Sequence, residues 1–293
     1  MEIISQLSAI VVPVFICVAF GVLWAKIGAP FDTGLITSLV YNIGVPCLIV
    51  ATFQKVTLDR TAMAEIALAS LACYVSFTLA GFLLIRALRL DTASYLPALM
   101  FPLTGSMGLP VSYFAFGDPG LALAIVYFAF GTIGSFTVGA AIAEGKVTLR
   151  GILRIPVLYA VTIAVAMQLS GLRMPEWIFN TVNLLGGIVI PAQLVALGFS
   201  LLQLRVGGMA RSAFLGVFRL AMGVAVGFVI ADLFDLTGAA RAVVILQSAM
   251  PVAVSSYLFA EKFNRQPAEV AGMVIVSTAV SFVTLPFLLL LVL

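Results

Sequence analysis

The sequence predicts an all-α integral membrane protein whose ten transmembrane helices form two inverted five-helix repeats. Three observations predict this fold class. The 293 residues are 63% hydrophobic and 9% charged, whereas an ordinary soluble domain carries about 25% charged residues. The apolar residues fall into segments of about 20, which is the length that crosses a bilayer. Prolines and glycines also recur at matched positions in the two halves of the chain.

The first repeat is expected to hold five spans, each ended by a short polar or turn-forming segment. Gly28 and Pro30 lie in the loop after the first span, and Asp118 to Gly120 form the turn between the fourth and the fifth. Prolines and glycines interrupt the fourth span, which predicts a broken helix. The predicted spans are Ser5–Ala25, Thr33–Phe53, Thr61–Ile85, Ala93–Phe116 and Leu121–Ala143.

A basic loop from Glu144 to Arg154 divides the chain near its midpoint, so the two repeats are placed at residues 1–147 and 148–293. In the second repeat, the turn Arg173 to Glu176 ends the sixth span, and Asp232 with Asp235 ends the eighth. Pro251 predicts a break in the ninth span. The predicted spans are Ile155–Leu169, Trp177–Leu202, Ser212–Ala231, Arg241–Ala260 and Val270–Leu293.

The repeat prediction rests on four pairs of landmark residues with nearly equal separations. Because each half holds an odd number of spans, the second half must be inverted relative to the first, as in many secondary transporters. Chance similarity between hydrophobic segments is the alternative. The pairs are Pro13 with Pro156 and Gly28 with Gly171, both 143 residues apart, Pro46 with Pro191, 145 apart, and Pro110 with Pro251, 141 apart.

The distribution of basic residues predicts the orientation in the membrane. Ten Lys and Arg residues lie in the odd-numbered loops and four in the even-numbered ones, so the odd loops are expected in the cytoplasm and both termini on the non-cytoplasmic side of the cell (inner) membrane. Arg219 lies inside the eighth span instead. Its long side chain is expected to extend back to the cytoplasmic interface, and the binding or steering of an anion is the alternative.

The candidate site is the crossing of the broken fourth and ninth helices. Unpaired N–H groups at the start of each second half-helix favour an anion, and nearby hydroxyl and amide groups add hydrogen bonds. The alternative is that these groups satisfy carbonyls freed by the prolines. The candidate substrate-binding residues are Thr104, Ser106, Gly108, Pro110, Ser112, Gln247, Ser248, Pro251, Ser255 and Ser256 at the crossing, with Asn42, Asn183 and Gln193 from the second and seventh spans.

Composition and motifs argue against several other functions. The chain has no histidine, so the commonest general base and metal ligand is missing, and no nucleophile or phosphate-loop motif occurs. We therefore expect no enzyme activity, no metal site, no resident cofactor and no nucleic-acid partner. Sodium coupling through carbonyl and hydroxyl oxygens stays open, while proton coupling has no evident carrier inside the spans.

Three motifs stand out: Tyr41-Asn42-Ile43-Gly44-Val45-Pro46, Gly108-Leu109-Pro110, and Ala249-Met250-Pro251-Val252-Ala253-Val254. They resemble motifs of the auxin efflux carrier family, and the resemblance covers essentially the whole chain. It implies a scaffold of spans 1, 2, 6 and 7, a homodimer through that scaffold, and a transport domain of spans 3–5 and 8–10 that moves like an elevator. Two positions depart from the asparagines that are frequent in the family, namely Leu103 and Ser255.

We expect a secondary transporter of a small organic anion, a mono- or dicarboxylate that is malate-, malonate- or auxin-like. The alternatives are a sodium-coupled organic-anion symporter of the bile-acid-carrier type and a non-transporting membrane sensor. A bulky residue at Ser255 or Gly108 is expected to abolish transport without unfolding the protein.

Overall fold

The computed structural model describes residues 2–57, 60–145 and 155–293, and these ranges are helical except for turns and one pair of extended residues. The predicted repeat boundary at residues 147 and 148 lies outside the described residues, as do the loop residues Lys146, Arg150 and Arg154. In order, the helices are α1 (Glu2–Lys26), α2 (Thr33–Leu39), η1 (Val40–Gly44), α3 (Val45–Lys55), α4 (Arg60–Ala87), α5 (Thr92–Met100), η2 (Thr104–Gly108), α6 (Leu109–Gly134), η3 (Ser135–Gly139), α7 (Ala140–Glu144), α9 (Pro156–Ser170), α10 (Glu176–Gly187), α11 (Val189–Gln203), α12 (Met209–Leu233), α13 (Gly238–Ser248), α14 (Val254–Lys262) and α15 (Pro267–Val292).

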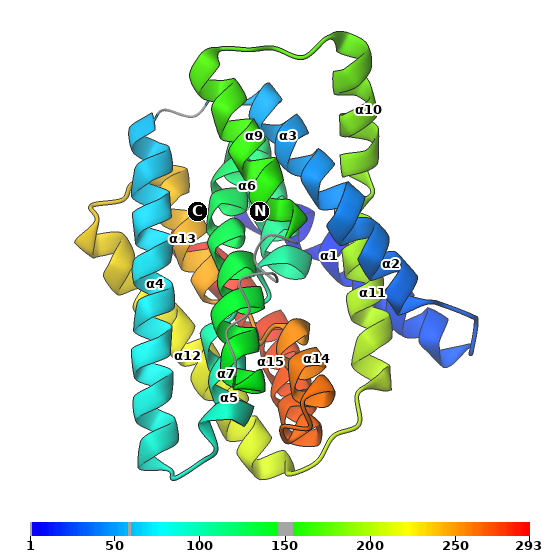
Figure 1. The fold of residues 1–293 in the computed structure, drawn as a ribbon, viewed down its shortest axis with the longest axis vertical. Coiled ribbons are helices and arrows are strands. Elements are labelled where there is room, and N and C mark those ends of the chain that lie inside the picture. Colours follow the sequence, from blue (N-terminus) through cyan, green and yellow to red (C-terminus); the bar gives the residue numbers. More distant parts are fainter. Residues whose placement is uncertain (1, 58–59, 146–154) are drawn as a thin grey trace.

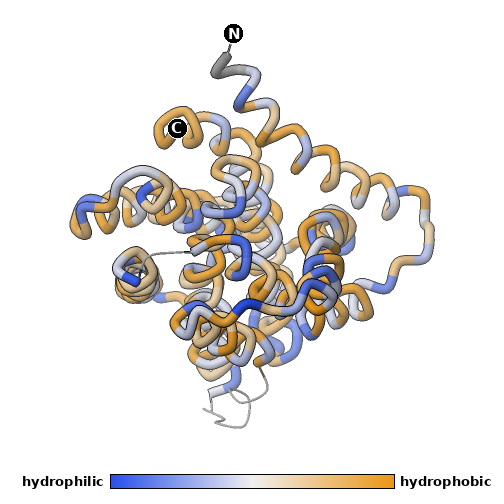
Figure 2. The backbone as a smooth tube through the Cα atoms, turned by 90° about the horizontal axis from the view of Figure 1, so that it is seen from above, coloured by the Kyte–Doolittle hydropathy of each residue, from blue (hydrophilic) through white to orange (hydrophobic). Residues whose placement is uncertain are grey.

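Seven helical segments in the described part of the chain are long and apolar enough to cross a bilayer. Hydrophobic residues run along most of the helices (Figure 2), and large apolar side chains are exposed, among them Leu184 at 79% and Trp177 at 72%. Water would penalise such an apolar exterior, whereas lipid solvates it. The prediction of an all-α, multi-pass membrane protein is therefore confirmed.

Local sequence signals place the helix ends close to the predicted boundaries. The Asp32 carboxylate accepts a hydrogen bond from the Leu35 N–H at 2.9 Å and caps α2, and Asp91 caps α5 in the same way through Ser94 at 3.0 Å. Gly171 ends α9 in the left-handed conformation (φ 67°), which a glycine adopts without strain. Its predicted counterpart Gly28 has nearly the same φ, 68°.

Pro46 and Pro110 each follow a wide π-helical turn, and in both cases the proline explains the turn. A proline inside a helix has no N–H, and its ring collides with the carbonyl four residues earlier. The chain widens by one residue before each: the Val45 N–H bonds to the Val40 carbonyl just before Pro46, and the Leu109 N–H bonds to Thr104 just before Pro110.

The helices pack into two groups (Figure 1). In the first, α1 packs along α11, and α3 packs against α9 and α10. In the second, α12 packs against α13 and α15, and α4 packs against α5 and α6. Helix α6 contacts both groups, since it also touches α1, α3 and α9. Gly21 and Gly198 let the backbones of α1 and α11 approach closely, because a Cβ at either glycine would overlap a carbonyl of the other helix.

Candidate functional site

Two short extended stretches cross at the centre of the second helix group. Pro102 pairs with Val252 in an isolated antiparallel bridge, the Leu103 N–H donates to the Pro251 carbonyl at 2.7 Å, and the Ala253 N–H donates to the Phe101 carbonyl at 3.1 Å. Helices α5 and α13 end at this crossing, and η2 and α14 begin there. The predicted meeting of four half-helix ends is therefore present.

The crossing uses a different part of the fourth span from the one that the repeat alignment indicated. The alignment paired Pro110 with Pro251, but the stretch that bonds to Pro251 is Phe101 to Leu103. Pro110 lies beyond η2, in the first turn of α6. The π-helical turn separates this proline from the break, so the proline marks a nearby helix start and not the crossing itself.

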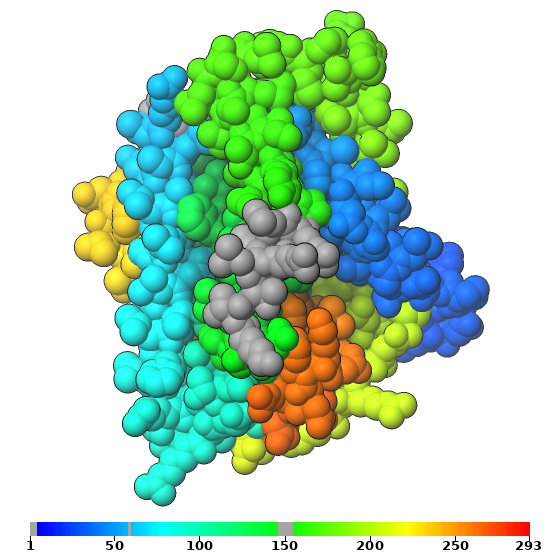
Figure 3. Space-filling view, in the orientation of Figure 1, coloured from blue at the N-terminus to red at the C-terminus, as the bar shows by residue number. Residues whose placement is uncertain are grey.

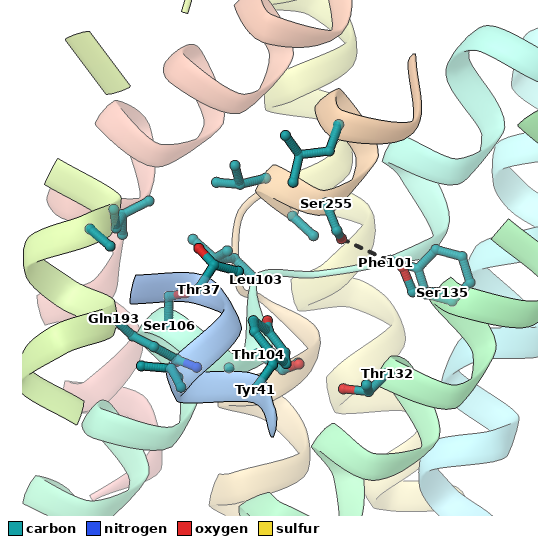
Figure 4. Close-up of a pocket in the computed structure, with 18 of the residues that line it drawn as sticks. Thr37, Tyr41, Phe101, Leu103, Thr104, Ser106, Thr132, Ser135, Gln193 and Ser255 are labelled. Carbon is teal, nitrogen blue, oxygen red and sulfur yellow. Dashed lines mark hydrogen bonds between the residues drawn. The ribbon is translucent and has the colours of Figure 1, made fainter. Parts of the chain in front are cut away.

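A cavity of about 260 Å³ lies beside the crossing (Figure 4). Four predicted site residues line it: Thr104 and Ser106 from η2, Gln193 from α11 and Ser255 from α14. The two positions that depart from the family pattern, Leu103 and Ser255, both belong to the lining. The cavity thus lies between the two helix groups, with walls from both.

Several cavity residues are not among those that the sequence predicts. Aromatic rings supply much of the apolar wall, and Phe101 packs against Gly134 and Gly139, where a Cβ would crowd its ring. The signal for the hydroxyl groups was present, because Thr132 and Ser135 lie about one helical turn apart inside an apolar span. The missed polar residues are Thr37, Ser38, Thr132, Ser135 and Ser200, and the missed aromatic residues are Tyr41, Phe101, Phe128 and Phe136.

Gln193 contributes a side-chain amide to the cavity wall that makes no hydrogen bond. Its side chain is 5% exposed, and neither the amide oxygen nor the amide nitrogen has a hydrogen-bond partner. In Figure 4 the side chain extends from α11 toward the other lining residues, and its amide atoms are themselves buried. Opposite it, the hydroxyls of Ser135 and Ser255 lie 3.5 Å apart. No Asp, Glu, Lys or Arg lines the cavity among the described residues.

The other predicted residues of the crossing lie outside the cavity lining and contribute to packing. The Gln247 amide is fully buried and donates to the Ser112 hydroxyl at 3.1 Å, and a Cβ at Gly108 would overlap this amide. The Ser256 hydroxyl donates to the Pro97 carbonyl at 3.2 Å. These side chains join the two broken helices to each other. Pro110, Ser248 and Pro251 are likewise absent from the lining.

The two asparagines that were expected to face the site are exposed and absent from the cavity lining. The Asn42 side chain donates to the Ser38 carbonyl at 2.8 Å, within its own helical segment. Asn183 is exposed on α10. Both amides therefore lie outside the cavity lining, and only Gln193 of this group belongs to it.

Arg219 corrects the expectation that its side chain extends to the membrane interface. The residue is fully buried (0% exposed), and both terminal nitrogens donate to the Ser248 carbonyl at 3.3 Å. The guanidinium carbon lies 4.5 Å from the centre of the Phe77 ring. The guanidinium therefore points into the protein, toward the end of α13.

The fold is that of a multi-pass helical membrane protein with a cavity between two helix groups, and sequence comparison gives its class as a membrane transporter. Residues 140–289 match the family described as membrane transport protein, which is just over half of the chain. The chain therefore belongs to this family, and the resemblance to auxin efflux carriers is confirmed.

One curated relative supports the same class of protein. An uncharacterized transporter of Methanocaldococcus jannaschii is 22% identical to this chain over 192 residues, and the alignment covers 62% of each protein. The chain thus matches less than two thirds of that relative.

Proposed function

We propose that this protein is a secondary transporter that carries a small organic anion through the cavity beside the crossing. The observation that carries the proposal is the unpaired Gln193 amide in the wall of a cavity of about 260 Å³. A buried amide without partners costs about 1–3 kcal/mol, and a ligand carboxylate would accept its N–H groups. The volume lies just below the range of about 300–1,000 Å³ that is usual for ligand sites, which favours a mono- or dicarboxylate.

The start of α14 supports an anion over a cation. Ala253, Val254 and Ser255 line the cavity, and no side chain caps the helix there. The first N–H groups of a helix have no partner within it and carry partial positive charge. With no carboxylate in the described lining, nothing in the wall neutralises this charge.

The proposed architecture is ten crossings in two inverted repeats. The symmetric hydrogen bonds at the crossing support it, as do the matched left-handed glycines Gly28 and Gly171. Helices α1–α3 and α9–α11 would form the scaffold and α4–α7 and α12–α15 the transport domain, matching the two packing groups. The substrate would move with the transport domain in an elevator-type cycle, and the scaffold would form a homodimer.

The orientation follows from the basic loops, with both termini on the non-cytoplasmic side of the inner membrane. Exposed lining residues, including Thr37, Ser38 and Leu258, mark the mouth of the cavity. Thr37 and Ser38 follow the first loop, which is cytoplasmic in this orientation. The structure would then represent an inward-facing state.

The test is counterflow in proteoliposomes that contain the purified protein and are preloaded with malate, malonate or a monocarboxylate, with and without a sodium gradient. Saturable exchange of one carboxylate is the expected result. Exchange that requires sodium would instead indicate a bile-acid-type symporter. Retained binding with no flux, from protein shown to be folded and inserted, would indicate a sensor and contradict the proposal.

A further inference from the structure

Arg219 places an isolated positive charge inside the second helix group. In the part of the chain that the structure describes, no carboxylate lies within ion-pair distance of it, and its Nε has no hydrogen-bond partner. A buried cation without a counter-ion is costly. The Ser248 carbonyl and the face of Phe77 offset only part of that cost.

The guanidinium binds the carbonyl end of α13, which lies at the crossing. The last carbonyls of a helix carry partial negative charge, and Arg219 contacts the carbonyl of Ser248, the last residue of α13. The other half-helix that ends at the crossing, α5, receives a neutral hydroxyl, because Ser256 donates to Pro97. The two ends therefore differ by one full charge.

A cluster of aromatic rings separates this charge from the cavity. The Tyr127 hydroxyl shares a hydrogen bond of 2.8 Å with the Ser248 hydroxyl, and the Tyr127 ring lies 5.3 Å from that of Tyr74. Tyr74 in turn lies 5.9 Å from Phe101 and contacts Gly131, which both line the cavity. Such an apolar cluster screens a charge far less than water does.

We infer that Arg219 sets the anion preference of the cavity. It acts as a positioning residue: it holds the carbonyl end of α13, neutralises that end and leaves a positive potential in the cavity. The inference rests on the proposed function for the nature of the substrate. A unit charge that acts across about 10 Å at an effective dielectric constant of about 20 changes the local concentration of a monovalent anion by roughly tenfold.

A charged thiol reagent measures this potential without any need for transport. Thr132 adjoins Gly131 in the cavity wall, and Thr132→Cys is placed in a variant whose native Cys17, Cys47 and Cys73 are serine. The readout is the ratio of reaction rates with an anionic (sulfonatoethyl) and a cationic (trimethylammonium-ethyl) methanethiosulfonate. Arg219→Gln should lower this ratio by roughly 100-fold, because the two reagents respond in opposite directions. Arg219→Lys keeps the charge and should restore most of the ratio.

Matched controls separate the field of this one charge from general effects. Arg211→Gln removes an arginine from the same helix, but Arg211 is paired with Glu269 at 3.1 Å near its exposed end, so the ratio should stay unchanged. Cys73→Asp, made in place of the serine at this position in the same background, covers the case in which Arg219→Gln does not fold. Cys73 contacts the Ser248 hydroxyl at 3.4 Å, so a carboxylate there would pair with Arg219, cancel its field and also lower the ratio.

An unchanged ratio in folded Arg219→Gln or folded Cys73→Asp would overturn the inference, since the charge would then be purely structural. The outcome is separable from that of the proposed function. Wild-type protein that exchanges no carboxylate, yet shows the fall in ratio with Arg219→Gln, contradicts the proposed function alone. Carboxylate exchange together with an unchanged ratio contradicts only the role of Arg219.

Discussion

Three glutamine side chains differ in how many hydrogen bonds their amides make, and the difference separates a structural role from a binding role. Gln54 is satisfied at both ends: its nitrogen donates to the Leu172 carbonyl at 3.2 Å, and its oxygen accepts from the Met174 N–H at 3.1 Å. Gln247 is satisfied at its nitrogen alone, and Gln193 at neither end. Of the three, only Gln193 belongs to the cavity lining, so the least satisfied amide is the one beside the cavity.

Replacing Gln193 should therefore impair transport without harming stability. Gln193→Leu keeps a similar volume and removes a buried, unpaired amide that costs about 1–3 kcal/mol, so thermal unfolding should occur at the same temperature or higher. Carboxylate exchange should fall by at least about tenfold, the equivalent of one lost hydrogen bond to a charged ligand. Gln54→Leu is the matched control and should show the reverse, lower stability with unchanged substrate affinity. Wild-type exchange by Gln193→Leu would remove this side chain from the site.

Gly108 is expected to matter for folding and not for substrate access, contrary to the expectation from the sequence. A Cβ at this position would overlap the fully buried Gln247 amide, which cannot move without breaking its bond to Ser112. Gly108→Ala should destabilise the protein by about 1–3 kcal/mol, visible as a lower unfolding temperature in detergent. Adding Gln247→Ala should recover part of the loss by making room. If Gly108→Ala unfolds like the wild type but fails to transport, the glycine belongs to the site after all.

The cavity residues were only partly predictable, because a hydroxyl inside an apolar helix can either bond to a carbonyl of its own helix or face a cavity. Thr137 donates to the Ile133 carbonyl of its own helix at 2.6 Å, whereas Thr132 and Ser135 face the cavity. Sequence alone identifies all three as polar residues in a span. Which of them faces a cavity depends on the rotation of the helix against its neighbours, and that rotation is fixed by tertiary packing.

At the scale of the elements, the existence of the breaks was predictable and their register was not. Prolines in apolar spans predict broken helices, and both broken spans are present. However, a π-helical turn absorbs the strain at Pro110, so the extended stretch forms earlier, around Pro102. The hydrogen bonds that fix this register join residues far apart in sequence, such as Leu103 and Pro251, and no local pattern encodes them.

The pairing at the crossing can be tested by removing one backbone donor. Leu103 has φ −75°, close to the value that a proline ring imposes, so Leu103→Pro deletes the N–H that bonds to the Pro251 carbonyl and keeps the backbone path. Leu103→Ala is the control, which shortens the side chain and keeps the N–H. The proline variant should be less stable than the alanine variant by about 1–3 kcal/mol, the cost of a buried carbonyl without its partner. Equal unfolding temperatures would show that the crossing does not depend on this bond.

At the scale of the whole molecule, two of the places where the helix groups meet have opposite character. The segment α2–η1–α3 contributes to the cavity at its start, through Ile36 to Tyr41. At its end, Lys55 forms an ion pair of 3.7 Å with Asp118. One end of the interface is thus hollow, and the other is held together by opposite charges. Composition could predict neither place, because each depends on how one group is docked against the other.

An elevator-type cycle requires the ion pair between Lys55 and Asp118 to separate, since it joins the proposed scaffold to the proposed transport domain. Lys55→Cys with Asp118→Cys, in the variant without native cysteines, should be joined by a short bifunctional thiol reagent with a reducible linkage. Exchange of carboxylate should then stop and return on reduction. A link between Gln54→Cys and Met174→Cys lies within the scaffold, where Gln54 already contacts the Met174 backbone, and should leave exchange unchanged. Protein cross-linked between positions 55 and 118 could instead exchange substrate at the same rate as protein without the cross-link. The two groups then do not move past each other at this point, and the division into scaffold and transport domain is wrong there.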